Sequence, residues 1–330
     1  MRLIALLYFI ISISPLGHSQ DIHFSNWSES PLISAAAITG NFTGNYRILG
    51  NFRNQWRSVT TPYKTTAISA DAREFIPTLT QLKAGISLAR DITGDSRWNT
   101  THAQCVLSYE ITWGEKFTVS PLIGTGIIQQ RYSNENLQYD QQWNGTYYDP
   151  SLLSGENFTP FNNNYLQFTH GISAEIIEKE SATTLGYSMQ LNTSNKNTSG
   201  HGSMRSSRTT IIGLHQHKLN DIFSIEPSIQ IHFQQNYRSI LPGIKLYRIL
   251  ETGSWHHAII QGGLKLRIAD AIIPNVGVQY DQWIGGMSYD INLSKLKVAS
   301  NGRGSFEMYI GTIINKLPKI EATPYCRPLY

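Results

Sequence analysis

Residues 223–234 read FSIEPSIQIHFQ, and this stretch decides the fold class. Its odd positions carry Phe, Ile, Pro, Ile, Ile and Phe, whereas its even positions carry Ser, Glu, Ser, Gln, His and Gln. Successive side chains of a β-strand point to opposite faces, so this period of two predicts a strand with one apolar and one polar face.

The same alternation recurs along most of the chain. We count about 14 such segments, with an uncertainty of two either way because strand boundaries are soft in a sequence. Strands of about ten residues exceed the usual five or six and suit a tilted crossing of a bilayer. Further clear examples are residues 82–88, 103–111, 166–176, 185–191, 260–268, 276–280 and 306–310.

The first residues predict export from the cytoplasm. Met1 and Arg2 give a positive start, residues 3–13 are almost wholly apolar, and residues 17–19 are Gly-His-Ser. This order is typical of a signal peptide, and the apolar run is shorter than the roughly 20 residues that span a bilayer as a helix. We expect a signal peptide over residues 1–19, cleaved before about Gln20. No Cys follows the apolar run, so no lipoprotein anchor is expected.

No later stretch is apolar enough for a spanning helix, so a closed barrel is the remaining way into a membrane. Composition agrees, since hydrophobic residues make up 40% and charged residues only 15% of the 330 residues. The net charge of +4 forms no basic stripe, so we expect no nucleic-acid partner.

The lengths of the connections between strands predict a barrel with short turns at one rim and long loops at the other. Long connections, residues 132–163 and 193–206, alternate with short turns, and this asymmetry is typical of bacterial outer-membrane barrels. We expect both termini at the short-turn rim, facing the periplasm. The short turns are expected at residues 76–78, 113–116, 178–181, 218–221, 251–254 and 284–286.

Tryptophans near strand ends favour a membrane barrel over the alternative, a soluble secreted β-sandwich. Aromatic girdles mark the two interfaces of such barrels. No linker divides the mature chain. The fold predicted is therefore all-β, an antiparallel transmembrane outer-membrane β-barrel of about 14 strands (12–16). The tryptophans in question are Trp56, Trp98, Trp113, Trp143, Trp255 and Trp283.

Three segments carry a family resemblance. Residues 21–40 hold Asp-Ile-His-Phe-Ser-Asn-Trp, then Ser-Pro-Leu and Ile-Thr-Gly; residues 46–71 hold Tyr-Arg, Asn-Phe-Arg-Asn-Gln-Trp, Pro-Tyr and Ser-Ala-Asp; residues 283–307 hold Trp-Ile-Gly-Gly, Ser-Tyr-Asp-Ile-Asn and Ser-Phe-Glu. Together they resemble the PorP/SprF membrane proteins of type IX secretion. Ala35 and its neighbours stand where that family has Asn-Pro, and the C-terminal Cys-Arg-Pro-Leu-Tyr differs in order from the family's Cys-Pro-Arg-Phe.

The resemblance implies a non-enzymatic barrel that serves type IX secretion and gliding motility in the outer membrane of a Gram-negative bacterium. Such a protein is either a component of the secretion machinery or a dedicated partner for the export and surface attachment of a large adhesin. The partners implied are outer-membrane lipid, secretion components, the adhesin and a periplasmic peptidoglycan-linked protein. The alternative on the same fold is a porin or solute transporter.

The resemblance and the alternation together single out candidate residues. Charged ones on the polar faces would point into the lumen and pair across strands, whereas Trp56 is expected in the interfacial belt. A direct role in partner binding is the alternative for the charged cluster. The candidates are Arg47, Arg53, Asn54, Gln55, Trp56, Asp71, Arg73, Trp283, Gly285, Tyr289, Asp290 and Glu307, with Cys326, Arg327 and Tyr330 in the tail.

The sequence predicts four segments along the chain. After the signal peptide we expect a periplasmic or lumenal segment over residues 20–42, the barrel over residues 43–316 and a Pro-rich tail over residues 317–330. The tail holds three prolines and cannot continue a central strand. It is interpreted as a plug or partner-binding element, or else as a disordered end. The long aromatic connection, residues 132–163, is interpreted as a protein-binding loop or as a lid.

No catalytic pattern is present, since neither a Gly-x-Ser-x-Gly elbow, a His-Glu-x-x-His pair nor a phosphate-binding glycine loop occurs. We therefore predict no enzyme, no cofactor and no metal, despite the nearby pairs His215/His217 and His256/His257. Cys105 lies on an apolar strand face and Cys326 in the tail, so no disulfide is expected between them.

Overall fold

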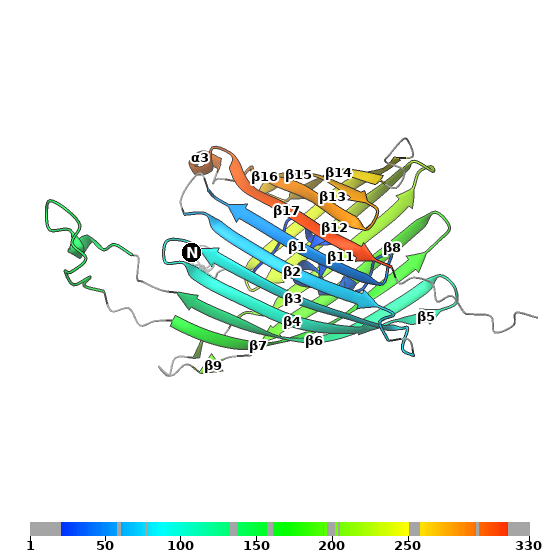
Figure 1. The fold of residues 1–330 in the computed structure, drawn as a ribbon, viewed down its shortest axis with the longest axis horizontal. Helices are drawn as coiled ribbons and strands as arrows, with labels where there is room; N and C mark the ends of the chain where they lie inside the picture. The colour runs from blue at the N-terminus through cyan, green and yellow to red at the C-terminus, as the bar shows by residue number, and fades with distance from the viewer. Residues whose placement is uncertain are drawn as a thin grey trace, which may run out of the picture.

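The computed structural model describes residues 21–57, 61–76, 78–132, 137–156, 161–193, 195–196, 202–203, 205–250, 258–294 and 297–315. In this part of the chain the strands close into one antiparallel barrel (Figure 1). The predicted signal peptide, Trp255, the His256/His257 pair and the Pro-rich tail with Cys326, Arg327 and Tyr330 lie outside the described residues.

Fourteen long strands of the described chain form the wall, which confirms the predicted fold. Neighbours in sequence pair with each other, β1 pairs with β17, and β4 pairs with β6 to complete the ring; short β5 (Ile111–Trp113) extends the wall beside β6. The strands are β1 (Tyr46–Gln55), β2 (Tyr63–Arg73), β3 (Leu82–Thr93), β4 (Trp98–Tyr109), β6 (Phe117–Tyr132), β7 (Phe161–Ile177), β8 (Ser181–Asn192), β11 (Arg208–Lys218), β12 (Phe223–Gln234), β13 (Tyr237–Leu250), β14 (Ala258–Arg267), β15 (Ala271–Tyr280), β16 (Trp283–Asn292) and β17 (Arg303–Ile314).

Alternation assigns each strand face to one side of the wall. On β12 the polar residues Gln230 and His232 are buried, whereas Ile229 and Phe233 on the other face are 38% and 39% exposed. An inverted surface of this kind, apolar outside and polar inside, is that of a transmembrane barrel.

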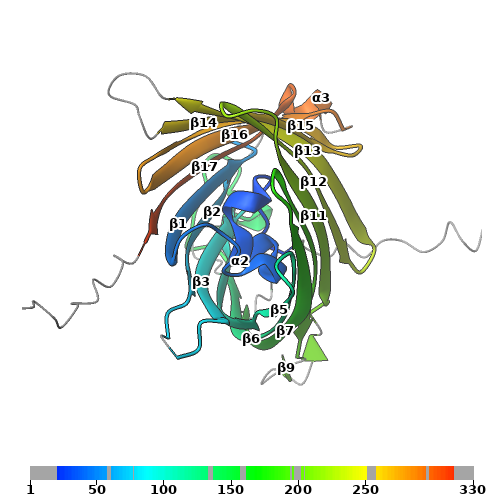
Figure 2. The ribbon, with the colours of Figure 1, turned by 90° about the vertical axis from the view of Figure 1, so that its right-hand side faces the viewer.

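Residues 21–40, which we call the lumenal plug, fold inside the barrel. Figure 2 shows their short helices η1 (Trp27–Glu29), α2 (Pro31–Ser34) and η2 (Ala36–Ile38) surrounded by the strands. Proline at the first position of α2 starts that turn, because its missing N–H would be unpaired there anyway. No helix in the described residues is long and apolar enough to cross a membrane.

The plug brings its own apolar core to the lumen. Trp27 is fully buried and packs with Ala35 and Ile38 against Ile212 and Leu241 of the wall. Smaller clusters of the same kind join Phe24 and Ile33 to Ala89, and Ala37 to Val106 and Leu122. Burial of apolar surface contributes about 25 cal/mol per Å², so these contacts stabilise the plug inside the barrel.

The two ends of the described chain lie at opposite rims. β1 begins where β17 ends, since Tyr46 pairs with Ile314 at what we call the short-turn rim. Asp21 instead donates its backbone N–H to Gln234 Oε1 at the end of β12 (3.2 Å), at the long-loop rim, which carries the connections between β6 and β7 and between β8 and β11. Residue 21 therefore lies at the rim opposite the end of β17, because the plug traverses the lumen before β1 begins, whereas the chain termini, which were predicted at one rim, lie outside the described residues.

One predicted turn is also wrong. Gly285 and Gly286 lie within β16, and the chain reverses at Asp281 and Gln282 instead. Asp281 takes the left-handed conformation (φ 50°), which aspartate tolerates better than most residues. A Cβ on Gly286 would lie 2.7 Å from the ring and hydroxyl of Tyr309, so glycine is needed here to admit that ring.

Stacked aromatic pairs lie at both rims, but only one of them faces outward as a girdle residue does. Trp113 stacks on Phe117 on the outer face at the short-turn rim, with ring centroids 5.8 Å apart. Trp98 and Tyr132 stack at the long-loop rim at 5.6 Å, but they share a strand face with the buried His102 and Gln130, so this pair lies on the lumenal side and does not belong to an outer girdle. Trp143, predicted at a strand end, instead lies in the connection between β6 and β7, bridged to Tyr148.

Candidate functional site: the lumenal plug and its mouth

A buried cluster of four charged side chains surrounds the first residues of the plug. Arg53 of β1 and Glu307 of β17 approach to 3.3 Å, and Asp290 of β16 lies 3.9 Å from Arg53 and 3.1 Å from Arg267 of β14. All four occupy polar-face positions of their strands, which alternation turns inward. Arg267 also pairs with Asp270 at 3.1 Å.

The plug uses this cluster as its anchor. The backbone N–H groups of Ser25 and Asn26 donate to the two carboxylate oxygens of Glu307 at 2.9 and 3.1 Å, and the Ser25 hydroxyl donates to Asp290 at 3.0 Å. Arg53 in turn donates to the backbone oxygen of His23 at 2.7 Å. Hydrogen bonds to charged groups contribute about 1.5–3 kcal/mol each, so the anchor is strong.

Two lysines of the wall hold the next turn of the plug. Lys245 of β13 pairs with Glu29 at 2.7 Å, and Lys265 of β14 donates to Asn26 Oδ1 at 2.8 Å while lying 5.5 Å from the ring centroid of Trp27. Burial alone would raise the pKa of Glu29, but the Lys245 ammonium outweighs it, so the pKa is lowered and Glu29 stays ionised.

A third group of contacts fixes the other end of the plug near the short-turn rim. Asp71 accepts two hydrogen bonds from Arg47 (2.9 and 2.7 Å) and one from the backbone N–H of Gly40 (2.9 Å). Arg73 donates to the backbone oxygen of Phe42 at 3.1 Å. The charge pairing predicted between the first two strands therefore occurs between Arg47 and Asp71. Arg53 instead pairs with Asp290 of β16 and Glu307 of β17.

Polar side chains of the wall also satisfy the carbonyl groups of the short helices. Arg208 of β11 donates to the backbone oxygens of Ile22 and Ile33 at 2.8 and 2.6 Å, and Gln230 donates to that of Ser34 at 2.9 Å. A buried backbone carbonyl without a partner is costly, so these donors make the irregular plug compatible with burial.

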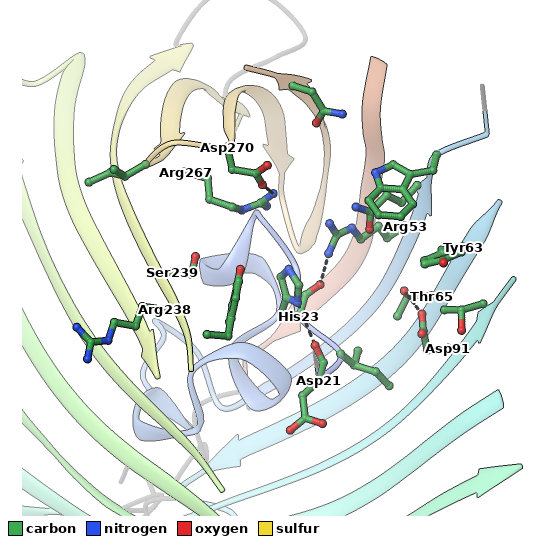
Figure 3. A pocket seen from close by; sticks show the side chains of 17 residues that line it. Asp21, His23, Arg53, Tyr63, Thr65, Asp91, Arg238, Ser239, Arg267 and Asp270 are labelled. Carbon is green, nitrogen blue, oxygen red and sulfur yellow. Dashed lines mark hydrogen bonds and ion pairs between the residues drawn. The ribbon is translucent and has the colours of Figure 1, made fainter. Parts of the chain in front are cut away.

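A cavity of about 650 Å³ opens above the plug at the long-loop rim (Figure 3). Asp21 and His23 of the plug lie among its lining residues, and Figure 3 shows His23 and Arg53 directed toward each other. The wall contributes cationic, acidic and aromatic groups at the same mouth: Arg53, Arg267, Asp91, Asp270, Trp56, Tyr63 and Tyr237. Such a mixed surface suits a polypeptide better than an apolar small molecule.

The structure divides the predicted site residues into three places. Trp56, expected in the interfacial belt, lines the mouth cavity with Gln55, because its left-handed backbone (φ 60°) breaks the alternation; its ring centroid lies 5.2 Å from that of Tyr63. Asn54 and Tyr289 line a hollow on the outer face, and Trp283 and Gly285 also lie apart from the lumenal cluster. Arg47, Arg53, Asp71, Asp290 and Glu307 are buried in the lumen and contact the plug or its anchors, with Arg73 nearby.

Three residues that join the wall to the plug were not predicted from the sequence: Lys245, Lys265 and Glu29. Lys245 and Lys265 stand between leucine or isoleucine neighbours on both sides, so alternation places each charge in the lumen and could have identified it. Glu29 carried no such signal, because the plug has no strand periodicity. Ile212 and Leu241 are apolar residues at lumenal positions, where alternation predicts polar ones. In the sequence such breaks in the alternation are the only sign that an apolar segment packs inside the barrel.

Comparison with known families assigns the chain. A family model described as "Type IX secretion system membrane protein PorP/SprF" matches residues 16–312, which include both the plug and nearly all of the barrel. The chain belongs to the PorP/SprF family. As a PorP/SprF protein it is an outer-membrane barrel of the type IX secretion system.

Other comparisons add no function to the PorP/SprF assignment. No curated protein matches the chain. Among solved structures, the CymD monoaromatic hydrocarbon channel is 8% identical (TM-score 0.48; 91% of this chain and 95% of that one), and CdiB from Acinetobacter baumannii is 5% identical (TM-score 0.47; 81% and 59%). The toluene transporter TbuX of Ralstonia pickettii is 11% identical (TM-score 0.46; 86% and 92%). At such values these similarities carry no inference about ligands.

Proposed function

We propose that this PorP/SprF-family barrel is a closed, non-enzymatic, partner-binding protein. It acts either as a component of the secretion machinery that contacts a periplasmic peptidoglycan-linked protein, or as the dedicated partner of a large adhesin during export and surface attachment. The long-loop rim faces the cell surface, and the end of β17 with the following tail faces the periplasm.

The observation that carries this proposal is the plug in the lumen. A diffusion porin keeps a water-filled channel, whereas this lumen holds residues 21–40 through the Lys245–Glu29 ion pair and through hydrogen bonds from the plug backbone to Glu307 and Asp71. Removing one partner of a buried ion pair costs about 3–5 kcal/mol, so spontaneous release of the plug is disfavoured. The plug supports an interaction role over solute transport.

Two surfaces at the long-loop rim suit a protein partner. One is the mouth cavity. The other is the segment 137–156, where Trp143 and Tyr147 are 56% and 59% exposed. This segment is folded on itself, because Gln142 accepts a hydrogen bond from the Tyr148 hydroxyl (3.1 Å) and donates one to the backbone oxygen of Leu152 (3.0 Å). Exposed aromatics on an ordered loop provide contact area at low entropic cost.

Co-purification after mild detergent extraction tests the proposal. We expect the wild-type barrel to recover a secretion component or a large adhesin, and Trp143→Ala with Tyr147→Ala to lose most of it. Trp113→Ala, an exposed aromatic at the short-turn rim, is the matched control and should retain an extracellular partner. In planar bilayers the wild-type protein should be nearly silent. A steady conductance, with normal secretion in a deletion strain, would favour a porin instead.

A further inference from the structure

A hollow of about 390 Å³ lies on the outer face of the barrel at the long-loop rim, where β1, β16 and β17 meet. It faces away from the lumen, because Asn54, Tyr289 and Phe306 alternate with the lumenal Arg53, Asp290 and Ser305. A register shift between β16 and β17 places Arg303 opposite the exposed Ile291 and so on the same outer face. Its lining residues are Asn54, Arg57, Tyr289, Arg303, Gly304 and Phe306. We propose that this hollow binds the phosphorylated headgroup of a lipid of the surrounding membrane.

An apolar hollow continues the site along the wall. It has a volume of about 190 Å³ and shares Tyr289 and Phe306 with the first hollow. Pro274, Val276 and Met287 line the rest of its apolar surface, and all of these lie farther from the long-loop rim than Arg303. The two hollows form one groove, polar at the rim and apolar toward the middle of the membrane, which is the polarity of a lipid molecule.

The rim end of the groove is cationic and lacks a protein anion. Arg57 and Arg303 are both exposed, and neither has an acidic partner among the described residues, whereas the lumenal Arg47, Arg53 and Arg267 are all paired. Guanidinium groups match phosphate oxygens in geometry and charge. Lys64, which is exposed beside Asn54 on β2, adds a third positive charge.

Asn54 gives a second indication of a polar ligand. Its neighbours on the outer face of β1 and β17 are apolar, yet it places an amide there, and the side-chain oxygen is buried without a hydrogen-bond donor in the described part of the chain. A lipid headgroup hydroxyl can supply that donor.

A membrane lipid is the occupant that fits both ends of the groove. Free phosphate would use only the arginines, and a soluble peptide would have to displace lipid from the apolar half. The site is separate from the mouth cavity, so it does not depend on the proposed partner.

Native mass spectrometry of the detergent-solubilised full-length barrel tests the site, with dioleoyl phosphatidic acid as the probe. We expect one tightly bound lipid, and about tenfold weaker binding of dioleoylglycerol, which has the same chains and no phosphate. Arg57→Gln with Arg303→Gln should weaken phosphatidic acid binding about tenfold. Met287→Trp, which fills the apolar hollow, should weaken it similarly while leaving both arginines in place.

The matched control removes two other exposed arginines of the same rim, Arg90→Gln with Arg131→Gln, and should change binding by less than about twofold. If this control weakened phosphatidic acid binding as much as the Arg57/Arg303 variant, the binding would reflect the general positive charge of the rim, and the proposal would be overturned. So would phosphatidic acid binding that resists both the double arginine variant and Met287→Trp. Competition by inorganic phosphate as effective as by the lipid would also overturn it. Heat-modifiable migration on gels verifies that each variant is folded.

Discussion

Arg53 and Glu307 face each other across the junction of β1 and β17, with Nε 3.3 Å from Oε1. The same carboxylate receives the backbone N–H groups of Ser25 and Asn26. One ion pair therefore joins the first and last strands of the barrel and also holds the plug between them. Barrel closure and plug docking are coupled through it.

Glu307→Gln should destabilise the barrel by about 3 kcal/mol, because it leaves Arg53 buried without its nearest anion. The loss is measured as a lower midpoint of urea unfolding in detergent. Lys218→Gln is the control, since it breaks the exposed Lys218–Asp221 pair (2.6 Å) and should cost less than about 1 kcal/mol. Equal shifts for the two variants would contradict a special role for Glu307.

Gly85→Val should release the plug while leaving the wall intact. A Cβ on Gly85 would lie 2.5 Å from Leu32 Cδ2, so the larger side chain and the plug cannot share the space. We expect stepwise openings in planar bilayers where the wild type is nearly silent. Gly262→Val is the matched control, because nothing lies within 4 Å of a Cβ at that position. Silence of the Gly85→Val variant would contradict the prediction.

The pair Glu29 and Lys245 should behave as a unit. Glu29→Gln leaves Lys245 only the more distant Glu226 (4.0 Å), and Lys245→Gln removes the ion-pair partner of Glu29, so each should cost about 3 kcal/mol, whereas the double variant should cost clearly less than the sum. Urea unfolding of the four proteins of this cycle measures the coupling. Simple additivity would show that the contact at 2.7 Å contributes little to stability.

Acidification should loosen the plug through His23. Burial, then the nearby Arg53, lower the pKa of His23 well below its ordinary value near 6.5, and its Nδ1 lies 3.0 Å from the backbone oxygen of Asp21. A depressed histidine pKa means that docking is fully stabilised above pH 6.5 and weakens as pH falls below it. Bilayer openings should thus be more frequent at pH 5.5 than at pH 7.5.

His23→Gln should reduce this pH dependence, since glutamine can keep a hydrogen bond to Asp21 without titrating. An unchanged dependence in the variant would assign the effect to another group. The buried Arg208 and Arg267, which also surround His23, stay charged throughout this range and do not account for it.

The wall was predictable because strand alternation is a local property. Ile229 and Gln230 differ by one position and end on opposite sides of the wall, as their polarity requires. The same rule placed Arg47, Arg53 and Asp71 in the lumen. It failed at Trp56, where a left-handed backbone turns the side chain into the mouth cavity. The turn predicted at residues 284–286 was wrong for a different reason, because Gly286 lies within β16 and accommodates the ring of Tyr309.

Alternation of apolar and polar residues, together with family motifs at both ends of the mature chain, was enough to establish an outer-membrane barrel of about 14 strands. The pairing of charges was left to the tertiary structure, because Arg53 could meet Asp71 or Glu307 equally well by strand face alone. Because closure of the barrel makes β1 and β17 neighbours, Arg53 pairs with Glu307. The plug also required the folded barrel, since its irregular backbone acquires hydrogen-bond partners such as Arg208 and Gln230 only inside the lumen.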